Sequence, residues 1–267
     1  MISKKEKPIK IFSKEKPIKI FSTGDKGTGL NVVKSPVKLM ILSLLNEGEM
    51  DFDDIVRILD KSKSTISVHL KNLTEEGIIS YKQNPIDKRK KIFYISSRFL
   101  GELEPPLKIE FPEQKIDHLV KNFDSEDNLG FSRLMFHTLR SILIKEGFTI
   151  NPLLYATGLE IGLSIYNSIK DEDYDNFISN LIIFWKDSGL GNMEIYKKGD
   201  SIKINITDCF ECEFLPKTGK PSCLLDLGIL ESLFSSYLNK NVNVIEVKCY
   251  TMGDECCLFE IEEELNQ

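Results

Sequence analysis

The order of segments in residues 35–98 constrains the fold more than any other feature of the sequence. Three apolar stretches with helical spacing come first, and they begin near Ser35-Pro36, Asp51 and Ser64. Ile78–Lys82 and Ile92–Ile95 then alternate like strands around a polar, basic turn. Three helices followed by a hairpin within about 65 residues is the order of a winged helix-turn-helix.

The third helix is predicted to present a polar face to a partner, because Ile66, Leu70 and Leu73 share its apolar side. The residues left on the other side are Lys63, Ser64, Thr65, Ser67, Val68, His69 and Lys71. Short hydroxyls and free backbone amides at a helix N-terminus bind phosphate, and small side chains let a helix approach base edges in a major groove. We therefore expect this helix to read double-stranded DNA.

The turn of the hairpin is basic and contains Lys88, Arg89, Lys90 and Lys91. Such a turn can contact a phosphate backbone or a minor groove, although a charge run alone is as typical of a solvated hairpin tip. Residues 1–100 hold 20 basic and 12 acidic side chains, whereas residues 101–267 hold 15 and 29. This asymmetry fits a DNA-binding first part, and also fits two differently solvated surfaces.

Residues 35–98 resemble the winged helix of ArsR-type regulators. The positions that carry the resemblance are Ser64, Ser67, His69, Leu70, Leu73 and Gly77. The resemblance implies a DNA-binding transcription regulator. Metal-sensing members use cysteines in this domain, and residues 35–98 have none, so the signal is expected to enter elsewhere.

All six cysteines lie at or beyond Cys209. No apolar run approaches the roughly 18 residues that span a bilayer or forms a signal peptide, so the expected compartment is the cytoplasm. There, clustered cysteines indicate metal binding or redox chemistry more often than disulfides.

Cys223 and the segment Glu246-x-x-Cys249-x7-Cys257 form a reasonable four-coordinate zinc set of three thiolates and a carboxylate. A hairpin can bring Cys249 and Cys257 together, and Cys223 would arrive at the start of a helix over Leu224–Leu238. In a regular strand Glu246 and Cys249 point to opposite faces, so the strand must bend or end there. Buried free cysteines remain the alternative on spacing alone.

Residues 125–262 resemble the 4-vinyl reductase domain of archaeal regulators and of bacterial phenol-responsive activators. The resemblance implies that Cys223, Glu246, Cys249 and Cys257 hold one structural zinc ion per chain. It also implies an α+β fold related to trafficking-complex subunits, with a pocket for a small apolar or aromatic ligand.

Cys209 and Cys212 fall outside this zinc set. They could be loop cysteines without a role, a dithiol–disulfide switch, or supplementary metal ligands. The two-domain architecture resembles methanogen-specific redox regulators, which makes the switch a hypothesis to test.

The expected fold is mainly α with α+β, a winged helix-turn-helix followed by a sensor domain of the 4-vinyl reductase type. Four segments are predicted: a basic arm over 1–30, the DNA-binding domain over 31–98, a linker over 99–124 and the sensor domain over 125–267. The arm contains a tandem repeat, Lys5–Ser13 and Lys14–Ser22, whose Ile and Phe residues could instead pair as short strands.

We therefore predict a homodimeric, non-enzymatic transcription regulator that senses a small apolar ligand or redox state. An enzyme or ligand carrier, or an assembly protein, is the alternative. The sequence has no nucleotide-binding glycine motif and no nucleophile–base pair, and four protein ligands would close the shell of the metal, so we assign no catalytic residue. No membrane partner is expected.

Overall fold

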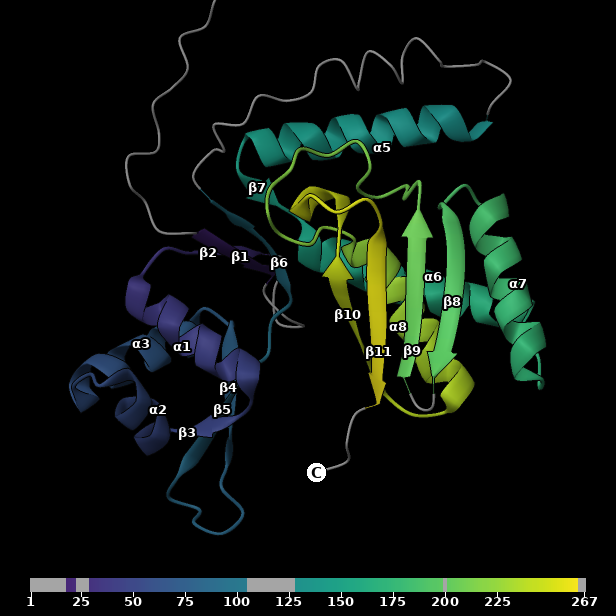
Figure 1. Cartoon of the computed structure of the whole chain (residues 1–267). Helices are drawn as coiled ribbons and strands as arrows, with labels where there is room; N and C mark the ends of the chain where they lie inside the picture. The colour runs from purple at the N-terminus through teal and green to yellow at the C-terminus, as the bar shows by residue number, and fades with distance from the viewer. Residues whose placement is uncertain (1–17, 23–28, 105–127, 199–200, 264–267) are drawn as a thin grey trace, which may run out of the picture. The chain divides into compact units, whose positions relative to one another are not determined.

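A computed structural model describes residues 18–22, 29–104, 128–198 and 201–263 (Figure 1). The chain divides into two compact units, residues 1–106 with 146–149, and residues 107–145 with 150–267. Among the described residues, no helix combines the length and apolar character that crossing a membrane requires.

The first unit contains the predicted winged helix-turn-helix. Its helices are α1 (Pro36–Glu47), α2 (Phe52–Leu59) and α3 (Lys63–Glu75), and its three-stranded sheet has the order β3 (Met50–Asp51), β5 (Lys91–Ile95), β4 (Ile79–Gln83). Ile41, Ile55 and Ile66, one from each helix, are fully buried in a common core. Asp51 accepts the N–H of Asp54 and so caps α2.

A second sheet of the first unit corrects two predicted boundaries. It has the antiparallel order β2 (Leu30–Val33), β1 (Ile18–Ser22), β6 (Phe99–Leu103), β7 (Phe148–Thr149). The end of the predicted arm is therefore a strand, and so is the start of the predicted linker. Strands on both sides satisfy the backbone of β1, and Phe21 is buried with its ring 5.2 Å from that of Phe99. The remaining repeat residues and most of the linker lie outside the described residues.

The second unit is an α+β domain, as predicted. Its antiparallel sheet has the order β10 (Val242–Lys248), β11 (Cys257–Glu263), β9 (Ser201–Thr207), β8 (Asn192–Lys198). Its helices are α5 (Asn128–Lys145), α6 (Asn151–Ile169), α7 (Tyr174–Asp187) and α8 (Leu224–Leu238). Figure 1 shows α6 and α8 side by side behind the sheet.

The core of the second unit lies between these helices and one face of the sheet. Ile202, Ile204 and Ile206 alternate along β9 and are all buried, because alternate side chains of a strand share a face. Trp185 is fully buried in the same cluster, as expected for a core residue. A short 3₁₀ turn (Tyr250–Met252) and the loop over residues 208–223 close one end of the sheet, where five cysteines meet.

Candidate functional site

Helix α3 of the first unit has the two faces that the sequence predicts. Ile66, Leu70 and Leu73 are buried under it. The exposed residues on the opposite face are Lys63, Ser64, Ser67, Val68 and Lys71, with Thr65 and His69 half-buried. The helix begins one residue before the predicted start, because the Ser62 hydroxyl accepts the N–H of Thr65 at 3.2 Å and caps it.

The hairpin between β4 and β5 forms the predicted basic wing. Lys88, Arg89, Lys90 and Lys91 are all exposed. The turn is ordered from within, because the Asn84 side chain accepts the N–H of Ile86 at 2.8 Å. The wing therefore presents cationic side chains from a defined backbone.

Carboxylates of the same unit already pair with several of these cations. Asp53 lies 3.2 Å from the ammonium group of Lys63 and 3.4 Å from that of Lys90, and Asp51 lies 3.5 Å from Lys90. The hydrogen bond from Lys63 is the largest of the interactions that lower the pKa of Asp53, so this carboxylate is ionised at neutral pH. Sequence reasoning missed these acids, although their place in and before the first turn of α2 is visible in the sequence.

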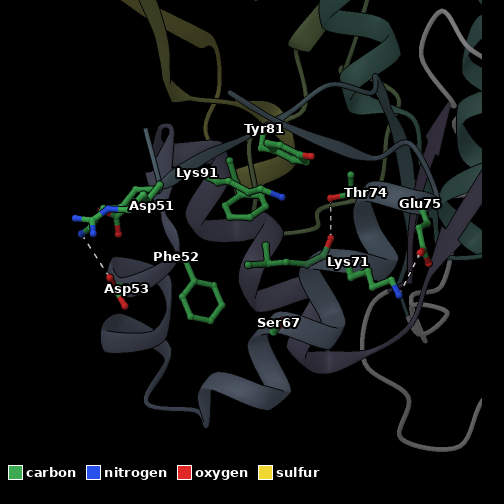
Figure 2. Close-up of a pocket in the computed structure, with 13 residues that line it drawn as sticks. Asp51, Phe52, Asp53, Ser67, Lys71, Thr74, Glu75, Tyr81 and Lys91 are labelled. Carbon is green, nitrogen blue, oxygen red and sulfur yellow. Dashed lines mark hydrogen bonds and ion pairs between the residues drawn. The ribbon is translucent and has the colours of Figure 1, made fainter. Parts of the chain in front are cut away.

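A groove of about 600 Å³ lies between α3 and the wing (Figure 2). Ser67 and Lys71 line it from α3, and Tyr81 and Lys91 line it from the hairpin. The Lys91 ammonium group lies 3.8 Å from the centre of the Tyr81 ring, a cation–π contact that holds it at the groove. Predicted DNA-binding residues from the helix and the wing thus border one continuous groove.

The second unit gathers five buried cysteines, which come from three parts of the chain. Cys209 and Cys212 lie in the loop after β9, and Cys223 directly precedes α8. Cys249 follows β10, and Cys257 is the first residue of β11. The sixth, Cys256, is half-buried and belongs to neither set of neighbouring ligand atoms in this cluster.

The predicted zinc set comes together as expected. The sulfur of Cys223 lies 3.8 Å from that of Cys249 and 3.6 Å from that of Cys257, and Glu246 completes a set whose ligand atoms all lie within 4.8 Å of one another. Glu246 and Cys249 can both face the cluster because the register of β10 shifts after Glu246 and the strand ends at Lys248.

Cys209 and Cys212 also join this cluster, which the zinc spacing did not predict. The sulfur of Cys209 lies 3.6 Å from that of Cys223, and the sulfur of Cys212 lies 3.2 Å from that of Cys257. These four cysteines form a second set within 4.8 Å of one another. The chain reaches this position through Asp208, whose left-handed backbone (φ 51°) turns the loop out of β9.

Buried polar groups hold the loop over the cluster. The Arg140 guanidinium of α5 donates to the Glu211 carboxylate at 3.1 Å and to the carbonyl of Ser222 at 3.0 Å. Glu211 also accepts the backbone N–H groups of Leu225 and Asp226 at the start of α8. This second layer fixes both the loop and the helix end that carry cysteines.

The protonation chemistry of the cluster suits a cation. Burial raises the pKa of Cys223, and it raises the pKa of Glu246 to about 9. Hydrogen bonds from neighbouring thiols, first from Cys212, lower the pKa of Cys209 and Cys249. Protons thus sit where a metal ion would bind. Four thiolates at about 2.3 Å from zinc lie about 3.8 Å apart, close to the spacings between these sulfurs.

Comparisons with known proteins match both units. The model for "Bacterial regulatory protein, arsR family" matches residues 35–81, and the model for the vinyl-4-reductase domain matches residues 202–263. Uncharacterized protein MJ1642 of Methanocaldococcus jannaschii is 33% identical over 131 residues, which cover 49% of this chain and 74% of that protein. Uncharacterized protein MJ0150 of the same organism is 28% identical over 158 residues, covering 57% of this chain and 90% of that protein.

A solved structure is also similar, a vinyl-4-reductase family protein from Methanocaldococcus jannaschii. It is 19% identical, with a TM-score of 0.34, and the match covers 60% of this chain and 99% of that one. The family assignment depends on the sequence matches and not on this similarity. The chain belongs to the same family as MJ1642 and joins an ArsR-family helix-turn-helix to a vinyl-4-reductase domain.

Proposed function

We propose that this protein is a cytoplasmic, DNA-binding transcription regulator whose second unit senses a small apolar ligand or redox state. The observation that carries the proposal is the exposed polar face of α3 beside a cationic wing, within residues that match the ArsR family. In this arrangement the helix contacts base edges and the wing contacts phosphate. The DNA-contacting residues are those that the sequence predicts on α3 and the wing.

The proposed active form is a homodimer, because helix-turn-helix proteins read two half-sites with paired recognition helices. Helix α5 supports a self-association surface. Met135, Leu139 and Ile142 are all more than half exposed and recur at helical spacing along it. A second copy of the same helix would cover such a stripe with matching apolar side chains.

The proposed cofactor is zinc, held by Cys223, Glu246, Cys249 and Cys257. A bound ion would fasten the start of α8 to the β10–β11 turn and so stabilise the fold of the sensor unit. The signal acts by favouring one dimer geometry over another, which changes the spacing of the recognition helices. Two inputs are proposed for this step, an apolar ligand or oxidation of the Cys209–Cys212 pair.

The decisive experiment is fluorescence anisotropy with the protein's own upstream DNA at several salt concentrations, with and without dithiothreitol. We expect tight binding that Ser67→Glu abolishes, because the added carboxylate repels phosphate at the exposed face of α3. Lys203→Ala, in the second unit, is the matched control and should bind like the wild type. Equal affinity of the wild type and Ser67→Glu for this DNA would contradict the proposed function. Binding that requires reductant would select the redox input, and binding indifferent to it would select the ligand input.

A further inference from the structure

We propose that the cysteine cluster of the second unit is a binuclear site for soft divalent metal ions, in which Cys223 and Cys257 bridge the two ions. Cys209 and Cys212 complete the shell of one ion, and Glu246 and Cys249 complete the shell of the other. The inference extends the single zinc site proposed above to a second ion. It does not depend on DNA binding.

The first observation is that two ligand sets share an edge. One set is Cys209, Cys212, Cys223 and Cys257, and the other is Cys223, Glu246, Cys249 and Cys257. Each set contains four donors within 4.8 Å of one another, and Cys223 and Cys257 belong to both. Two tetrahedral ions that share an edge need six donors, two of them common. The two sets contain that number of different residues.

The second observation is the spacing of the sulfur atoms. The proposed shared edge, Cys223 to Cys257, measures 3.6 Å. Edges on the two sides measure 3.6 Å from Cys209 to Cys223 and 3.8 Å from Cys223 to Cys249. Around zinc, with bonds of about 2.3 Å, a tetrahedral edge is about 3.8 Å long. Both sets have edges of about this length, so neither has a geometric claim over the other.

The third observation is charge. Five thiolates and one carboxylate would carry six negative charges in a cluster whose cysteines are fully buried. One divalent ion would leave four of these charges uncompensated, unless protons remained on buried thiols beside the ion. Two divalent ions leave two, which is the charge of an ordinary four-cysteine zinc site. The nearby Arg140 is already paired with Glu211 and does not replace the second ion.

The fourth observation concerns Glu246, whose two oxygens differ. Oε2 accepts the N–H of Cys223 at 2.9 Å. Oε1 is buried and has no hydrogen-bond partner among the residues that the structure describes. A buried carboxylate oxygen without a donor is costly, and a metal ion would satisfy it. This oxygen is available to the ion that Cys249 shares.

The test counts metal ions in the full chain. Native mass spectrometry and elemental analysis of the protein as isolated should give two ions per chain. Cys209→Ser combined with Cys212→Ser should give one, and the control Cys256→Ser should keep two. One ion in the wild type, with Cys209 and Cys212 as free thiols or a disulfide, would overturn the binuclear site and leave the single zinc proposal intact. A metal-free, folded wild type would overturn both.

A magnetic readout tests the bridging directly and does not depend on the stability of a variant. Protein produced in cobalt-containing medium should carry two high-spin Co(II) ions, and bridging thiolates couple their spins. We expect a weak electron paramagnetic resonance signal per cobalt in the wild type and a full signal per cobalt in the Cys209→Ser, Cys212→Ser variant. A full signal per cobalt in a two-cobalt wild type would exclude shared thiolates. Recovery of inorganic sulfide with two iron ions would exclude them as well.

Discussion

Gly158 of α6 lies directly against Gly228 of α8. A Cβ atom placed on Gly158 would come within 3.0 Å of the Cα of Gly228, and one placed on Gly228 would come within 3.1 Å of the Cα of Gly158. The same added atoms would approach the carbonyl oxygens of Leu225 and Tyr155 even more closely. The two helix backbones therefore touch, with no side chain between them.

Gly228→Ala should destabilise the second unit by about 3 kcal/mol, since backbone atoms cannot move aside as a side chain can. Urea unfolding followed by the fluorescence of Trp185 measures this loss, because Trp185 is buried in the same unit. Leu163→Ala is the matched control, since Leu163 is exposed on α6 and its truncation should be nearly neutral. Equal unfolding midpoints for Gly228→Ala and the wild type would show that the helices can separate freely.

Asp53→Asn should strengthen DNA binding several-fold at low salt. The substitution frees Lys63 and Lys90 from a carboxylate that pairs with both, so both become available to phosphate. Fluorescence anisotropy on the same DNA measures the change, with Glu194→Gln in the second unit as control. Weaker binding by Asp53→Asn would mean that Asp53 positions these lysines for DNA instead of competing with it.

Arg89→Ala should weaken binding about equally for specific and random DNA. Arg89 is exposed at the wing and pairs only locally, with Asp87 at 3.1 Å, so we expect it to contact phosphate and not bases. The slope of log K against log salt concentration should become shallower by about 1, because one phosphate contact is lost. An unchanged slope would remove Arg89 from the interface.

His137 should make the second unit less stable in acid. Burial, with help from Arg133 and Arg140, lowers its pKa from 6.5 to about 4. Between these values the unfolded chain binds a proton that the folded chain does not, so stability falls as pH falls through this window. The loss between pH 6.5 and pH 5 should be about 2 kcal/mol.

Urea unfolding of the wild type and of His137→Gln at several pH values isolates this contribution. Acid release of metal affects both proteins, so the difference between them reports on His137. The difference in unfolding free energy should shrink steadily from pH 7 to pH 5. A constant difference across this range would show that His137 does not titrate as the structure implies.

Leu139→Glu should convert the homodimer to a monomer, because it places a charge in the middle of the exposed apolar stripe of α5. Light scattering after size-exclusion chromatography measures the mass. Leu163→Glu, equally exposed on α6, is the control and should stay dimeric. A dimeric Leu139→Glu would place the self-association surface elsewhere.

The sequence alone predicts most of the regular structure, because local signals and tertiary packing agree. The hairpin of the wing and α8 both fall within one residue of their predicted bounds. Strand β1 was harder to predict, since its five residues are a strand only where β2 and β6 supply partners. A basic repeat gives no sign of those distant partners.

The cysteine cluster shows the same limit. The zinc spacing identifies Cys223, Glu246, Cys249 and Cys257, because they lie on a hairpin and a helix end with recognisable patterns. Cys209 and Cys212 reach the cluster only because Asp208 turns the chain and Glu211 pairs with Arg140, a residue 71 positions away. Spacing between cysteines carries no information about such a contact.

The position of Cys257 in the last strand of the sheet sets an order of events during synthesis. Domains generally fold as they emerge from the ribosome, so the helix-turn-helix can fold before the thiols of the other unit exist. Each of the two ligand sets needs Cys257, so neither is complete until β11 has been made. In a cell short of metal we therefore expect young molecules able to bind DNA whose sensing half is not yet mature.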